Sequence, residues 1–258
     1  MNGPLLTQKT KEICAYIDDL LSIPAIKDFP NAYNGLQVDN NGDVTRLGGA
    51  VDANPESLHL AIQKQVDFLC VHHGLHGFGT KPLIGNYGQF YKTCFEHNVA
   101  IYSVHLPLDI HPILGHNASI SRLLHLTNMD TFAHFEGQPV GIVARTKKSR
   151  RQLKQDLKNL FPHSLHSLEF GPLLPQRIGI VSGSGGQSLL EEVQKHSIDT
   201  LITGEVRYAA FTFAQFHNIN IYACGHYATE VFGIKNLLAA VSKQFNLPCA
   251  FIDVGSDL

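Results

Sequence analysis

The sequence predicts an α/β fold whose strands are largely buried and partly parallel. Two observations lead to this prediction: apolar strand-like runs alternate with helix-like segments along the chain, and no repeat of 20–50 residues or low-complexity tract interrupts the order. Ligands in such folds bind at the carboxyl ends of the strands. The residues that directly follow each strand are therefore the first candidates for a functional site.

Helical spacing and proline placement predict the elements of the first half. Ile13, Ile17, Leu20 and Leu21 recur at the spacing of one helix face, and Pro55 favours the first turn of a helix. Apolar runs such as VDFLCV and VAIYSV indicate buried strands. The expected elements are strands 44–51, 66–71 and 99–104, and helices 7–22, 55–65, 86–97 and about 117–126.

The second half repeats this pattern. Its apolar runs, such as RIGIVS, IDTLIT and INIYAC, each lead into a glycine, and a basic amphipathic segment precedes them. Polar residues and Gly137 interrupt the pattern at 127–138 and indicate a boundary there. The expected elements are strands 139–145, 177–182, 198–203, 219–224 and 249–254, and helices 149–160, about 187–196, 206–216 and 228–244.

Composition narrows the class of protein. The chain has 258 residues, 44% of them hydrophobic and 16% charged, which suits a globular core and argues against disorder. A net charge of −2 disfavours a general nucleic-acid binder. No apolar run reaches the roughly 18 residues that cross a bilayer, and no signal peptide is recognisable. Five scattered cysteines without a C-x-x-C pair suit reduced thiols, so we expect a cytoplasmic protein without a membrane partner.

Potential metal ligands follow three of the predicted strands. His226 and Glu230 are four residues apart at a helix start, which places both side chains on one helix face. His72 and His73 directly follow a strand, and Asp109 lies in a proline-flanked loop after the next strand. Three imidazoles and two carboxylates can hold two divalent ions, with iron, zinc or manganese all compatible with these ligands.

Other interpretations of these residues stay open at this point. Any one of the histidines could be a hydrogen-bonded core or surface residue instead of a ligand. A serine hydrolase is the competing enzyme class, but the chain lacks a G-x-S-x-G motif.

Six segments resemble the NIF-three-like family, whose members are also called GTP cyclohydrolase I type 2 homologues. They are NGLQV at 34–38, VHHG at 71–74, VHLPLDIHPILGHNAS at 104–119, ITGEV at 202–206, GHYATEVFGI at 225–234 and FIDV at 251–254. They span almost the whole chain in the family's order. The chain departs from the family in having no tryptophan after HHG, where His76 could add a polar group.

The resemblance implies an architecture and a metal centre. It implies two similar α/β lobes with mixed sheets, which we place at 1–126 with 224–258 and at 127–223, with a metal pair at strand carboxyl ends between the lobes. It also implies a ring-shaped homohexamer. The implied metal ligands are His72, His73, Asp109, His226 and Glu230, and Glu230 is expected to bridge both ions.

Several further residues have both a functional and a structural interpretation. His105 could be a proton shuttle beside the metals or a loop histidine, and Glu205 could be a general base or a first-turn glutamate. Gly183–Gly186 is interpreted as a tight turn in preference to a phosphate cradle, and Lys147–Arg151 as a solvated helix start. His111 and His116 are expected to be exposed.

The resemblance suggests a hydrolase and leaves a second class open. The implied activity is metal-dependent opening of the imidazole ring of GTP with release of formate, so the expected partner is a small molecule such as a nucleotide. The alternative is a non-catalytic metal carrier or an assembly or regulatory ring protein. A DNA-associated ring is disfavoured because the chain lacks a strong basic excess.

Overall fold

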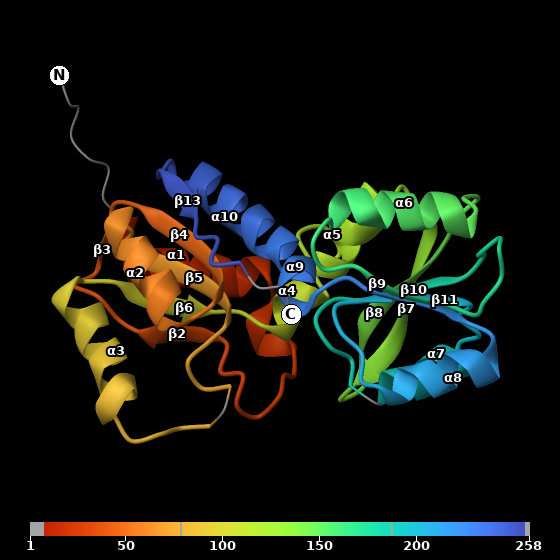
Figure 1. Cartoon of the computed structure of the whole chain (residues 1–258). Coiled ribbons are helices and arrows are strands. Elements are labelled where there is room, and N and C mark those ends of the chain that lie inside the picture. Colours follow the sequence, from red (N-terminus) through yellow and green to blue (C-terminus); the bar gives the residue numbers. More distant parts are fainter. Residues whose placement is uncertain (1–7, 78, 187, 256–258) are drawn as a thin grey trace. The chain divides into compact units, whose positions relative to one another are not determined.

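The chain forms two compact units, shown in Figure 1. The computed structural model describes residues 8–77, 79–186 and 188–255. The first unit comprises residues 1–108 and 233–254, and the second comprises 109–232 and 255–258. Residue 7 of the first expected helix and residue 187 of the helix expected after Gly186 lie outside the described residues.

The first unit contains a five-stranded mixed sheet in the order β13-β4-β5-β6-β2. Strands β13, β4, β5 and β6 are parallel, whereas β2 pairs antiparallel with β6 at the edge. A short antiparallel ribbon joins β1 to β3. The strands are β1 Gln8–Lys9, β2 Gly35–Val38, β3 Asp43–Val44, β4 Leu47–Asp52, β5 Phe68–His73, β6 Ala100–Ser103 and β13 Cys249–Phe251.

Helices cover both faces of this first sheet. Leu58 and Phe90 from α2 and α3 are buried against Leu69 on one face. On the other face, a Cβ added to Gly49 of β4 would lie 2.9 Å from Ile234, so glycine lets α10 approach the strand closely. The helical segments that belong mainly to this unit are α1 Thr10–Leu20, η1 Ile23–Ala25, α2 Pro55–Gln63, α3 Gly85–Glu96, α4 Leu106–Asp109 and α10 Val231–Phe245.

The second unit contains a six-stranded mixed sheet in the order β7-β8-β10-β11-β12-β9. Strands β10, β11 and β12 are parallel, and antiparallel strands flank them on both sides. These strands are β7 Thr127–Phe135, β8 Gln138–Arg145, β9 His166–Glu169, β10 Ile178–Val181, β11 Thr200–Thr203 and β12 Asn220–Ala223.

Two helix pairs sandwich the second sheet, as Figure 1 shows. Helices α5 and α6 pack on one face, where Leu153 is buried with Ile178. Helices α7 and α8 pack on the other face, where Val193 is buried with Leu201. The helices of this unit are α5 His116–Leu123, α6 Arg150–Leu160, α7 Ser188–Lys195, α8 Ala209–His217 and α9 His226–Thr229. The fold class is therefore the predicted one, with two mixed α/β units.

The unit boundaries differ from the positions given by the sequence. They fall at 108/109 and 232/233, whereas the sequence places them at 126/127 and 223/224. The segment after residue 108 joins the second unit because Ile120 and Leu124 of the α5 region are buried in that unit's core. Phe232 packs edge-on against Phe161, which extends the second unit past residue 223.

The predicted boundary at 127–138 is wrong in detail, because most of it is the edge strand β7. Only Phe132 and Ala133 of that strand are buried, so its sequence lacks the apolar run of a central strand. The edge strands β2 and β9 were missed for the same reason, since half-exposed strands carry a weaker apolar pattern.

The basic run at 147–151 forms a helix start, as expected. Ser149 caps α6 by accepting a hydrogen bond from the Gln152 amide. Lys148 forms an ion pair with Asp156, and Arg150 donates to the Gly171 carbonyl oxygen at 3.1 Å. Lys148 and Arg150 of this run therefore form contacts that stabilise the structure around α6. No helix in the described part of the chain is both long and apolar enough to cross a membrane.

We expect one rapidly reacting thiol per chain. Cys249 is exposed, whereas burial raises the pKa of Cys14 and Cys94 to about 12 and also raises the pKa of the Cys70 and Cys224 thiols. A disulfide reagent such as DTNB at pH 8 should therefore give a fast phase of one thiol, with the remaining thiols at least ~10-fold slower. Retention of that fast phase in Cys249→Ser would contradict the expectation.

Candidate metal centre

Three histidines gather at the carboxyl ends of two neighbouring strands in the first unit. His72 and His73 are the last residues of β5, and His105 follows β6. One ligand nitrogen from each ring lies within 4.8 Å of those of the other two. The ring centroids are 4.7 Å apart for His72 and His73, and 5.0 Å apart for His72 and His105. The structure thus brings together two predicted ligands and the predicted proton shuttle.

Each of these rings is oriented through its Nδ1 atom. Nδ1 of His72 donates to the Val104 carbonyl oxygen at 2.9 Å, which can only accept. Nδ1 of His73 lies 2.8 Å from an Asp52 carboxylate oxygen. A donating Nδ1 makes Nε2 the basic nitrogen of the ring, and metal-ligating histidines are typically oriented in this way.

His105 is held in the same manner by Asp28. Its Nδ1 lies 2.9 Å from Asp28 Oδ1, and its backbone amide donates to Asn34. Burial alone would raise the pKa of Asp28, but the hydrogen bond and charge of His105, with Asn34, lower it overall. The ionised carboxylate therefore fixes both the position and the tautomer of the His105 ring.

A pocket of about 360 Å³ opens onto the three histidines. Residues 29–32, on the loop that Asp28 anchors, form much of its remaining wall. Gly74 and Gly77 complete the lining. An added Cβ at Gly74 would lie 2.3 Å from the side-chain amide nitrogen of Gln37, so a larger residue there would have to displace the end of that side chain. His73 and His105 each expose part of their side chain, whereas His72 is fully buried.

His226 and Glu230 form the centre of a second group, in the second unit. Glu230 is buried, and its Oε1 atom lies 3.3 Å from Nε2 of His226. Nδ1 of His226 lies 3.4 Å from Oε1 of the exposed Glu205. The spacing of four residues therefore does place His226 and Glu230 in contact. The short helix α9 presents His226, and Glu230 follows at its end, before α10 begins.

The two carboxylates change the protonation of His226. Burial alone would lower the pKa of His226, but the hydrogen bond and charge of Glu230, together with Glu205, raise it to about 9. Without metal the imidazole therefore carries a proton at neutral pH. A divalent cation could replace that proton, because it would meet the same two carboxylates and a neutral ring.

The run Gly183–Gly186 follows β10, and the backbone at Gly183 packs against His226 and Glu230. Gly183 has a φ of +58°, and an added Cβ would lie 2.1 Å from Glu230 Oε1 and 3.0 Å from His226 Nε2. Its amide donates to Thr229 Oγ1 at 3.0 Å, and its carbonyl accepts from the Glu205 amide. The backbone at Gly183 therefore closes one side of the carboxylate group.

Asp109 and His116 lie together in the second unit, where Asp109 contacts Ser182, the residue directly before Gly183. Asp109 is buried, its Oδ1 accepts from Ser182 Oγ at 2.8 Å, and a His116 ring nitrogen lies within 4.8 Å of its carboxylate. The expectation that His116 is exposed is wrong, because His116, the first residue of α5, is fully buried. His111 is half-buried and accepts from the Leu114 amide.

His116 and Ser182 are thus neighbours of the predicted ligand Asp109. The sequence alone does not indicate either of them as a site residue. Neither residue stands out in a single sequence, since His116 is one of 15 histidines and Ser182 is one of 14 serines.

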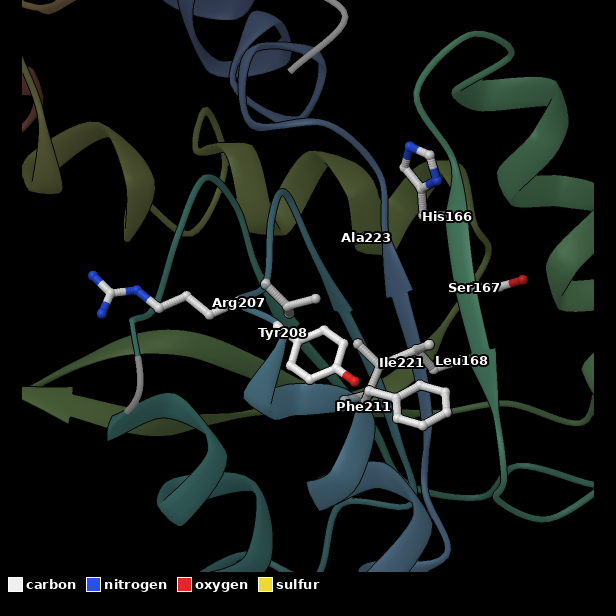
Figure 2. A pocket seen from close by; sticks show the side chains of 9 residues that line it. His166, Ser167, Leu168, Arg207, Tyr208, Phe211, Ile221 and Ala223 are labelled. Atoms are coloured by element: carbon white, nitrogen blue, oxygen red, sulfur yellow. The ribbon is translucent and has the colours of Figure 1, made fainter.

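Figure 2 shows a separate pocket in the second unit, with a volume of about 350 Å³. The rings of Tyr208 and Phe211 face it, and β9 and β12 supply Leu168 and Ile221. The guanidinium of Arg207 extends away from these rings in the view of Figure 2. None of the predicted site residues lines this pocket, although Val206, which directly follows Glu205, does.

The donor sets fit borderline divalent metal ions. The first unit supplies imidazole nitrogens that hydrogen bonds hold in place. The second unit supplies the imidazole of His226 and the buried carboxylates of Asp109 and Glu230. Mixed nitrogen and oxygen donors of this kind suit iron, zinc or manganese. The fold and these groups define a mixed α/β protein with potential metal-binding residues at strand ends.

A family model for Duf34/NIF3 (NGG1p interacting factor 3) matches residues 8–257. The chain therefore belongs to this family, and the resemblance drawn from its sequence motifs is confirmed.

Relatives and solved structures agree with this assignment. The chain is 33% identical to the "GTP cyclohydrolase 1 type 2 homolog" of Pyrococcus abyssi over 246 residues, covering 94% of this chain and 97% of that protein. It is similar to the crystal structure of TTHA1606 from Thermus thermophilus, with a TM-score of 0.87, 31% identity, and coverage of 97% of this chain and 100% of that chain. The protein ybgI, described as of unknown function, gives a TM-score of 0.88 at 29% identity, with the same coverage.

Proposed function

We propose that this chain binds two divalent metal ions through His72, His73, Asp109, His226 and Glu230. The observation that carries the proposal is the buried Glu230 carboxylate, which contacts His226 Nε2 and is enclosed by the Gly183 backbone. A buried carboxylate is costly unless a cation compensates it, and a metal ion would do so more fully than one proton. Glu230 is the residue we propose to bridge both ions.

The proposed activity is hydrolysis of a nucleotide, of the GTP cyclohydrolase type. The names of relatives such as that of Pyrococcus abyssi support this substrate class. When bound, the metal pair supplies Lewis acidity for hydrolysis.

Two residues of the chain would move protons in this reaction. His105 is held by Asp28 with Nε2 as its basic nitrogen, so it can accept a proton at that atom and return it to a leaving group. Glu205 is 53% exposed and lies two residues after β11, so its carboxylate can reach an incoming substrate. The proposal also includes assembly into a ring-shaped homohexamer, which light scattering on the purified protein would test.

The activity is tested by formate release from GTP. Protein loaded with iron, zinc or manganese should release formate, and the rate should fall at least ~100-fold in His105→Ala, because positioned acid–base groups contribute about 10²–10⁴-fold. His97→Ala is the matched control, since His97 is an exposed histidine that caps the far end of α3. Metal-loaded protein that releases no formate would overturn the hydrolase and favour the non-catalytic metal carrier.

A further inference from the structure

A histidine-carboxylate cluster outside the predicted centre lies between an edge strand and a helix of the second unit. His134 comes from β7, Glu192 from α7, and His196 directly follows α7. One ligand atom from each residue lies within 4.8 Å of those of the other two. Glu192 and His196 are four residues apart, so they share one face of the helix end.

Both distances from the histidines to Glu192 are close to the separation of ligands around a small cation. His196 Nε2 lies 3.4 Å from Glu192 Oε2, and His134 Nδ1 lies 3.8 Å from the same oxygen. Two ligands at about 2.0–2.1 Å from a tetrahedral zinc ion are themselves roughly 3.4 Å apart. Little movement is therefore needed to place an ion between the three side chains.

Two of the three ligand atoms are buried without a hydrogen bond. Among the described residues, neither Glu192 Oε2 nor His196 Nε2 has a hydrogen-bond partner, and both atoms are shielded from solvent. Buried polar atoms of native proteins are nearly always paired, so such atoms require an explanation. A bound cation would satisfy both at once.

The surrounding structure holds the ligands in place. Arg177 Nε donates to the His196 carbonyl oxygen at 2.7 Å, and the buried ring of Phe132 contacts the His196 ring edge-on. Lys195 binds the other carboxylate oxygen of Glu192 at 3.1 Å, which keeps Oε2 directed toward the histidines. The side chain of His134 remains 46% exposed, so an ion can enter from solvent.

This cluster is separate from the predicted centre. Helix α7 begins beyond the carboxyl end of β10, near the Gly183 turn, and runs back to His196, which contacts Arg177 just before β10 begins. His196 therefore lies at the amino end of β10, whereas His226 and Glu230 follow the carboxyl end of β12.

We infer that His134, Glu192 and His196 form a mononuclear site for a divalent transition-metal ion of the zinc class. Two imidazoles and one carboxylate supply three ligands, and the exposed side leaves room for water to complete the coordination. The ion would join the edge strand β7 to α7 and so stabilise that edge of the sheet. The competing interpretation is a plain ion pair between Glu192 and protonated histidines, which would hold no metal.

Zinc binding to single-residue variants tests this inference. Equilibrium dialysis against Zn²⁺ should show one ion fewer per chain in His134→Ala than in the unchanged protein, or an affinity at least ~10–100-fold weaker. The same difference should appear when both proteins also carry Glu230→Gln, so the result does not depend on the proposed metal pair. His163→Ala is the matched control, because His163 is an exposed histidine of the same unit.

A second measurement guards against misfolding of the variant. In the unchanged protein, Zn²⁺ should slow modification of His134 and His196 by diethylpyrocarbonate, read by mass spectrometry, and leave His163 unaffected. Loss of one zinc ion together with this protection supports the site. Equal zinc content in His134→Ala and His163→Ala, or no protection of His134 and His196, overturns it and leaves the ion pair.

Discussion

Replacing Glu230 by glutamine is expected to weaken divalent-metal binding by at least ~100-fold, since changing even the outer partners of a ligand costs about 10–100-fold. The Glu230 side chain is only 4% exposed, and its oxygen lies beside His226 Nε2. Glutamine keeps the shape of the side chain but cannot supply the negative charge that the cation requires. Metal-induced stabilisation of the fold should fall accordingly.

The change is measured as the rise in melting temperature on addition of Mn²⁺ or Zn²⁺. Both proteins should also carry His134→Ala, so that the separate cluster does not contribute. Glu191→Gln is the matched control, because Glu191 is an exposed glutamate in the first turn of α7. An unchanged metal-induced rise in Glu230→Gln would show that this carboxylate is not a ligand.

Replacing Gly183 by alanine is expected to disturb both stability and metal binding. The new methyl group would lie 2.1 Å from Glu230 Oε1, and the residue's φ of +58° adds backbone strain. We expect a loss of about 1–3 kcal/mol in the free energy of unfolding, together with displacement of Glu230 from its position beside His226. Denaturant unfolding and metal titration measure the two effects.

Gly186→Ala separates the strain from the collision. Gly186 has a φ of +63°, but an added Cβ there meets no atom within 4 Å. The Gly186→Ala protein should therefore lose stability through backbone strain alone, and its affinity for metal should be unchanged. If Gly183→Ala bound metal as tightly as Gly186→Ala, the close approach of the turn to Glu230 would have no role in the site.

Central elements of the fold could be predicted from the sequence because buried parallel strands are almost continuously apolar. Strand β5, with the run FLCV, and strand β11, with TLIT, are such cases. The edge strand β7 could not be found in the same way, because it exposes most of its side chains and buries only Phe132 and Ala133 fully. The sequence does not reveal that residues 109–126 belong to the second unit, because the packing of α5 on that unit's sheet is a tertiary contact.

The candidate site was predictable where a local rule applied. Helical spacing correctly places His226 against Glu230, and the end of β5 presents His72 and His73. The tautomers of these rings depend on Val104 and Asp52, which lie on other elements and were not foreseen. The contact of Asp109 with Ser182 joins positions 73 residues apart, so no local pattern could indicate it.

Metal content per chain tests the central proposal most directly. The protein should be purified without chelators or a polyhistidine tag, carry His134→Ala, and be dialysed after exposure to iron(II), zinc or manganese. Elemental analysis should then find two ions per chain, held by the five proposed ligands. One ion would contradict a metal pair, and none with any of the three metals would contradict a metal centre at these residues altogether.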